Sequence, residues 1–270
     1  MRQASAFFIA VISATALTAG ELPEKVPQRS AWRAFVPGSW IIVHEIKTLS
    51  GKKHEARFKD VLLKHEDESP ILERASQVDG QFAPMGDRLQ IRPGGIPAES
   101  DIVKRRKETL TIGDHSIPCA VLEYKLENRE KQFSATLAFW HGPERKVPYR
   151  DIPSGAGNRP ALLSDVVRAD YAYQYEGNAV RYSVEVIDFA CKVAVDGRDL
   201  TCVKESISFE ETAKEKSGGG SGFRWLSSEV PGHEVRFILE GKSGGAAVAI
   251  ERNVLAFKAT TDSKTKARTP

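Results

Sequence analysis

The residues best placed for chemistry are two cysteines on either side of a tight turn. Asp196-Gly197 is typical of a two-residue hairpin loop, whose central residues adopt positive φ. Counting outward from this turn places Cys191 directly opposite Cys202, at a spacing that a disulfide accepts. The sequence therefore predicts a Cys191–Cys202 disulfide and leaves Cys119 as a free buried thiol. The alternative is that all three cysteines are small core residues.

Motifs of the catalytic type lack their partners in this sequence. Residues 241–245 (GKSGG) fit the pattern of a serine nucleophile, but no histidine follows Ser243. The histidines never stand at H-x-H or H-x-x-x-H spacing, and there is no C-x-x-C pair for a metal. Carboxylates are frequent, but runs such as 66–68 and 210–211 fit solvated loops. We therefore expect no catalytic residue, no metal site and no cofactor.

Two tryptophans are the candidates for ligand binding. Trp140 lies 21 residues after Cys119, and Trp225 lies 23 residues after Cys202. Large aromatic side chains at such positions either line a ligand groove or belong to the core. Both interpretations remain open, and Trp140 and Trp225 are the predicted ligand-binding residues.

The tryptophans and cysteines belong to a pattern that occurs twice. Residues 108–119 (ETLTIGDHSIPC) and 191–202 (CKVAVDGRDLTC) each alternate apolar and polar residues around a turn. In the first copy the count across the turn places Glu108 opposite Cys119. In the second it places Val193 opposite Leu200, on the face that we expect to be buried. A Val-Pro pair follows each tryptophan, at 147–148 and 230–231. The repetition predicts a duplicated β unit.

The elements that hold these residues are mostly strands. Alternating or β-branched segments, separated by Gly- and Pro-rich turns, predict strands at 41–46, 54–65, 71–73, 132–140, 171–175, 180–186 and 246–258. Residues 161–168 predict a short helix, and residues 217–222 (SGGGSG) predict a flexible loop. The predicted fold is mostly β, with two tandem related antiparallel β units, as curved sheets or open half-barrels, and few short helices.

The ends of the chain set the predicted compartment and boundaries. Residues 1–20 have the charged, apolar and small-residue order of a signal peptide, which predicts an exported protein, periplasmic or extracellular. We expect a flexible leader at 21–31, β unit 1 at 32–150, a linker at 151–160, β unit 2 at 161–259 and a disordered tail at 260–270. No later segment is apolar for long enough to span a membrane.

The charge of the chain excludes one class of partner. The net charge is +3 over 270 residues, which is no electrostatic footprint for nucleic acid. The basic run at 104–107 (KRRK) is short and fits a solvated strand edge or loop. The sequence sets no oligomeric state.

Three segments carry a resemblance: residues 37–40 (PGSW), residues 108–119, and residues 225–232 with their Trp and Val-Pro. They resemble an uncharacterised group of exported bacterial β-proteins. More distantly, the chain is similar to the periplasmic lipoprotein-carrier superfamily, whose curved antiparallel sheets bind acyl chains under a lid of short helices. The resemblance implies an exported, non-catalytic binding or interaction protein that holds an apolar small molecule or lipid. The alternatives are an exported hydrolase using carboxylates and a structural module of the cell envelope.

Overall fold

A computed structural model describes most of the chain between residues 31 and 260. The gaps are 67–68, 91–100, 129–131, 144–146, 149, 152–160, 163–164, 176, 214–215 and 244. The predicted signal peptide, nearly all of the leader and linker, and residues 261–270 of the predicted tail lie outside the described residues. Thr260 is described, and its main chain bonds to the hydroxyl of Ser39.

The described residues form fifteen strands. They are β1 (Trp40–Leu49), β2 (Lys52–Glu66), β3 (Ser69–Val78), β4 (Gln81–Gln90), β5 (Ile102–Ile112), β6 (His115–Asn128), β7 (Phe133–His141), β8 (Arg150–Asp151), β9 (Ala161–Leu162), β10 (Val166–Tyr175), β11 (Asn178–Val195), β12 (Arg198–Ala213), β13 (Lys216–Leu226), β14 (Glu234–Ser243) and β15 (Ala246–Lys258). This confirms the mostly-β prediction.

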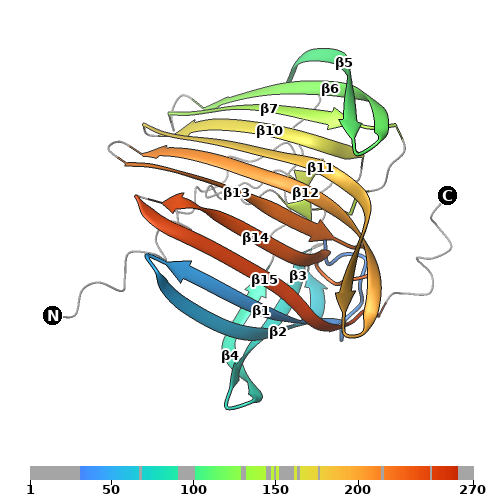
Figure 1. The fold of residues 1–270 in the computed structure, drawn as a ribbon, viewed down its shortest axis with the longest axis vertical. Helices are drawn as coiled ribbons and strands as arrows, with labels where there is room; N and C mark the ends of the chain where they lie inside the picture. Colours follow the sequence, from blue (N-terminus) through green and yellow to red (C-terminus); the bar gives the residue numbers. More distant parts are fainter. Residues whose placement is uncertain are drawn as a thin grey trace.

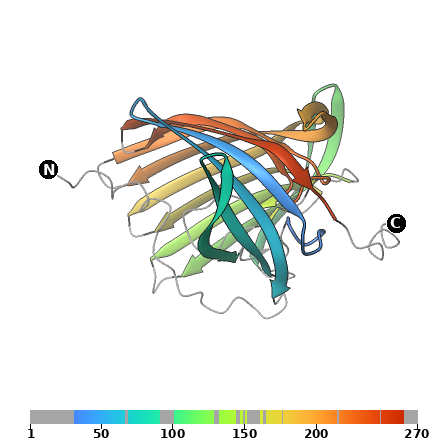
Figure 2. The same ribbon diagram turned by 90° about the horizontal axis from the view of Figure 1, so that it is seen from below.

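Thirteen of these strands make one antiparallel sheet (Figure 1). Its order is β4-β3-β2-β1-β15-β14-β13-β12-β11-β10-β7-β6-β5, and β8 pairs only with β9. The sheet arches without closing, since its outer strands β4 and β5 do not pair with each other (Figure 2). Strands of both predicted units therefore lie in one sheet, with β1 beside β15. The unit boundaries at 150 and 161 remain a prediction.

The predicted registers of the two repeated hairpins are confirmed. Cys191 lies opposite Cys202 and Val193 opposite Leu200 in the β11–β12 hairpin. Glu108 lies opposite Cys119 in the β5–β6 hairpin. Asp196 and Gly197 both have positive φ, 50° and 72°, as the two-residue turn requires. The basic run 104–107 lies in β5, an outer strand of the sheet, as predicted.

Two local predictions are wrong. The described residues of the range 161–168 form no helix: β9 occupies 161–162, and β10 begins at Val166, whose β-branched side chain suits a strand. Residues 217–222 are not a loop but part of β13; all of them pair with β12, and residues 219–222 also pair with β14. A Cβ atom at Gly222 would lie 1.9 Å from the main-chain oxygen of Ile238, and one at Gly220 would lie 2.4 Å from that of Glu240. These glycines therefore permit a close approach of β13 and β14.

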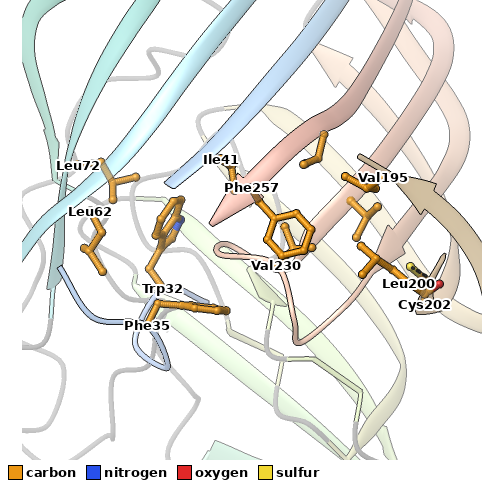
Figure 3. Packing of buried hydrophobic residues seen from close by; sticks show 12 residues of the cluster. Trp32, Phe35, Ile41, Leu62, Leu72, Val195, Leu200, Cys202, Val230 and Phe257 are labelled. Carbon is orange, nitrogen blue, oxygen red and sulfur yellow. Dashed lines mark hydrogen bonds between the residues drawn. The ribbon is translucent and has the colours of Figure 1, made fainter. Parts of the chain in front are cut away.

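Buried apolar side chains form three clusters. The β11–β12 hairpin contributes residues to the second cluster, and the β5–β6 hairpin contributes residues to the third. The β11–β12 hairpin is longer than its neighbours, and its tip bends past the ends of β14, β15 and β1 (Figure 1). There Val195 and Leu200 pack with Phe257 and Val230 (Figure 3). This confirms the predicted buried face of the hairpin. The β5–β6 hairpin packs in the same way around Trp140.

Candidate functional site

A groove of about 1030 Å³ crosses β6, β7, β10, β11, β12 and β13. Two rows of direct cross-strand partners line it. The first row is Glu123, Ala138, Asp170, Ser183, Ser208 and Ser221, and the second row is Lys125, Thr136, Ala172, Arg181, Glu210 and Gly219. Direct partners point to the same face of a sheet, so both rows belong to one face, here named the groove face. With neighbouring strands about 4.8 Å apart, the groove is about 24 Å long.

The opposite face carries the aromatic core, here named the aromatic face. The row between the two groove rows includes Tyr124, Leu137, Tyr171 and Tyr182, which are buried in the first cluster. Side chains alternate between the two faces along a strand. These residues therefore contribute main chain to the groove, while their side chains fill the core.

Differences in side-chain size hollow the groove face. Half of the twelve residues in the two groove rows are serine, alanine or glycine, four of them in the first row. The next row along the strands, here named the border row, carries Trp140, Arg168 and Phe223. Phe223 is 39% exposed, although it lies in the middle of the sheet. No sequence motif predicted the groove, whose one signal is the run of small residues at alternate positions in β12 and β13.

Carboxylates of the groove are paired with arginines at its border. Asp170 accepts hydrogen bonds from the hydroxyl of Ser183 at 2.6 Å and from Nη2 of Arg168 at 2.9 Å. Glu123 accepts one from Nε of Arg106 at 3.0 Å. Burial alone would lower the pKa of Arg168, but the hydrogen bond and charge of Asp170 raise it above its ordinary value. These contacts fix the orientation of the Glu123 and Asp170 carboxylates on the side of the groove next to the border row.

Trp140 lies beside the groove and does not line it. Its side chain is only 4% exposed and belongs to the third apolar cluster. The guanidinium carbons of Arg106 and Arg168 lie 5.3 and 4.6 Å from its ring centroid. A hydrogen bond from Arg106 lowers the pKa of Glu108. The Trp140 ring thus packs against Arg106 and Arg168, the two arginines that pair with the groove carboxylates.

Trp225 occupies a different place from Trp140. It lines a smaller cavity of about 310 Å³ under the β11–β12 hairpin, together with Val193 and Asn253. The cationic ends of Lys204 and Arg236 lie 5.1 and 5.2 Å from its ring centroid. The structure therefore does not bring the two predicted tryptophans into one site, and their role in ligand binding stays a prediction.

The three cysteines carry free thiols in this structure. The Cys191 thiol donates to the main-chain oxygen of Cys202 at 3.2 Å instead of bonding its sulfur. Burial raises the pKa of Cys202 to about 12, which makes that thiol a poor nucleophile at neutral pH. Cys119 is buried, as predicted. The pairing register is thus in place, while the disulfide itself stays a prediction.

A buried ion pair lies on the aromatic face, in the row that continues from Val186. Glu205 is fully buried and Arg224 is 5% exposed. Oε2 of Glu205 accepts from Nε of Arg224 at 3.0 Å and from Nη2 at 2.7 Å. Burial alone would lower the pKa of Arg224, but the charge and hydrogen bonds of Glu205, together with smaller contributions from Tyr182 and Glu234, raise that pKa. The pair is a fixed polar element inside the core.

Two other kinds of feature are absent from the described residues. Within that part of the chain, no three histidine, cysteine, aspartate or glutamate residues stand close enough to bind a metal ion. No helix there has the length and apolarity of a transmembrane span.

Comparisons with known proteins give the chain two structural neighbours. No protein-family model matches the sequence, and no curated protein matches it. A Bacteroides fragilis protein with a YmcC-like fold, described as exported, superposes with a TM-score of 0.33 at 10% identity, over 83% of this chain and 98% of its own. The hypothetical lipoprotein YmcC of Escherichia coli K12 gives a TM-score of 0.28 at 9% identity, over 80% and 86%. No family follows from these likenesses, and the groove is interpreted from its own residues.

Proposed function

We propose that this chain is an exported, non-catalytic binding protein whose ligand lies in the groove across β6–β13. The observation that carries the proposal is the groove itself. Its volume of about 1030 Å³ is that of a large ligand site, and its polar groups stand in two ordered rows. Export rests on the signal-peptide pattern of residues 1–20.

The resemblance to lipoprotein carriers implies a more specific version, with an apolar ligand or lipid held by the curved sheet. On the aromatic face, residues such as Leu137 and Tyr171 are 3% and 6% exposed and pack against one another. In the groove, an acyl chain would cover Asp170 and Arg181, and covering charged groups without hydrogen bonds is costly. The groove lining therefore supports a polar ligand better, and an apolar ligand is the competing outcome of the test.

A hydrolase is the second candidate, because the groove holds two carboxylates in one row. Glu123 and Asp170 flank Ala138, two strand spacings or about 10 Å apart, near the upper end of the separation in inverting glycosidases. Such an enzyme needs one of the two carboxyls protonated as its acid. Here each carboxylate is already engaged in an arginine hydrogen bond, Glu123 with Arg106 and Asp170 with Arg168. This arrangement supports binding over catalysis.

The test is to fill the groove and measure binding. Ser208 is exposed in the first row, between Ser183 and Ser221, so Ser208→Trp blocks the groove with little strain. Thr48→Trp is the matched control, because Thr48 lies on the same face in β1, outside the groove. The probes are a fluorescent fatty acid and a set of neutral oligosaccharides. We expect one probe class to bind the parent chain and the Thr48→Trp variant, and to lose at least tenfold in affinity for Ser208→Trp. Equal affinity for both variants would remove the groove as the site.

A further inference from the structure

We infer, on the basis of the proposed groove function, that the ligand is a neutral carbohydrate chain. The groove combines hydrogen-bonding groups of both kinds with small apolar surfaces and balanced charge. The first two properties each disfavour another class of ligand, and the third favours sugar rings.

The first property is the mixture of donors and acceptors. Carboxylates in the lining only accept hydrogen bonds, the side chains of Lys125 and Arg181 only donate, and hydroxyls such as those of Thr136 and Ser208 do both. A sugar hydroxyl also donates and accepts, so a saccharide can bond to every group along both rows. An acyl chain satisfies none of them and leaves covered polar groups unpaired.

The second property is the charge. The lining has four carboxylates, Glu123, Asp170, Glu210 and Glu211, against two cations, Lys125 and Arg181, a difference of −2. At the border, Lys104, Arg106 and Arg168 pair with Glu123 and Asp170, and Glu108 shares Arg106, so that these three cations and one further carboxylate bring the difference to zero. A polyanion needs a surplus of cations to replace its counterions, and this surface has none. The balance fits an uncharged ligand.

The third property is the apolar surface within the polar rows. Ala138, Ala172 and Gly219 lie between the polar side chains of the floor, and Phe223 stands exposed in the border row. Lys204 covers part of the Phe223 ring, with Nζ 4.4 Å from the centroid. The faces of sugar rings carry C–H groups, which pack on short apolar side chains and on aromatic rings. A groove about 24 Å long accommodates several sugar rings in a row.

The experiment measures the binding of four uncharged hexasaccharides, one each of the cellulose, maltose, chitin and xylan series, by calorimetry. Comparison probes are a fluorescent fatty acid and a sulfated oligosaccharide. We expect micromolar to millimolar binding of at least one uncharged hexasaccharide, changed less than twofold between 50 and 200 mM salt. Ser208→Trp should weaken it at least tenfold and Thr48→Trp less than twofold. Asp170→Asn should weaken it severalfold, and hydrogen exchange should show protection in β10–β12.

The possible outcomes separate this inference from the proposed function. If only the fatty acid binds, and Ser208→Trp abolishes its binding, the groove is a ligand site but its ligand is not carbohydrate. If only the sulfated chain binds, with affinity falling steeply in salt, the neutral ligand is also wrong. If no probe binds, or binding is the same in Ser208→Trp, both proposals are overturned. Thermal melts of each variant establish that a loss of binding is not a loss of folding.

Discussion

Removing one partner of the buried ion pair should destabilise the protein far more than removing both. In Glu205→Leu, the guanidinium of Arg224 keeps its charge but loses the carboxylate that accepts two of its hydrogen bonds. Arg224 is only 5% exposed, so water replaces little of that interaction. Loss of one partner from a buried pair costs about 3–5 kcal/mol. For a protein of this size, the midpoint of thermal unfolding should fall by about 6–20 °C.

The double variant Glu205→Leu/Arg224→Met should recover most of that loss, because it leaves no uncompensated charge in the core. The control is Lys53→Met, which removes an ion pair to Glu55 at 3.3 Å whose side chains are 60% and 49% exposed. That substitution should cost about 0–1 kcal/mol. Urea unfolding followed by circular dichroism gives all four free energies. The reasoning is refuted if Glu205→Leu costs no more than Lys53→Met, or if the double variant is the least stable.

Three further predictions concern stability and thiol chemistry. Gly222→Ala should destabilise the protein by about 1–3 kcal/mol in urea unfolding, because its Cβ would meet the main chain of β14, whereas Gly142→Ala, with ordinary contacts at 3.4 Å, should be close to neutral. In the native protein, iodoacetamide should react with half-buried Cys191 before buried Cys202. A count of thiols after denaturation without reductant should give three for the structure described and one if the predicted disulfide forms. Burial, with a smaller contribution from the neighbouring Tyr173, raises the pKa of Tyr171. The neutral phenol of Tyr171 therefore contributes stability that is present below about pH 10 and is lost above it. Tyr171→Phe should flatten the fall of melting temperature between pH 9 and 11, and an unchanged slope would contradict this.

Local pairing could be predicted from the sequence, because it depends on residues close together in the chain. The turn at Asp196-Gly197 fixes the register of its hairpin, so the position of Cys191 opposite Cys202 follows by counting. The same holds for Glu108 and Cys119. The burial of one hairpin face follows from the alternation of valines and leucines with polar residues.

Predictions failed where long-range contacts decide the structure. The glycines of β13 read as a loop by composition, but strands on both sides supply hydrogen bonds to their main chain and hold them in the sheet. The apolar residues at 161–168 suit a helix locally, yet Val166 pairs with His141 of β7. The pairing of β1 with β15, between residues 199 to 218 positions apart, has no local signal.

The candidate site could not be predicted from the sequence for a related reason. No pair of groove residues stands in a recognisable motif, because the first row takes one residue from each of six strands. Asp170 and Ser183 are adjacent in space and 13 residues apart in sequence. Serine and alanine at such positions carry no chemical signature by themselves. These residues can be recognised as the lining of a groove only when the strand register places them beside the large side chains of the border row.

The order of the strands has a consequence for the connectivity of the chain. β4 and β5 follow each other in the sequence but are the two outer strands of the sheet, while β15 and β1 are adjacent near the opposite ends of the sequence. Joining the termini through a short linker and opening the chain between Gln90 and Ile102 would make each of the thirteen strands pair with its nearest sheet strand in the new sequence. Such a circular permutant keeps every contact of the sheet but has a much lower contact order. It should therefore fold faster than the natural arrangement.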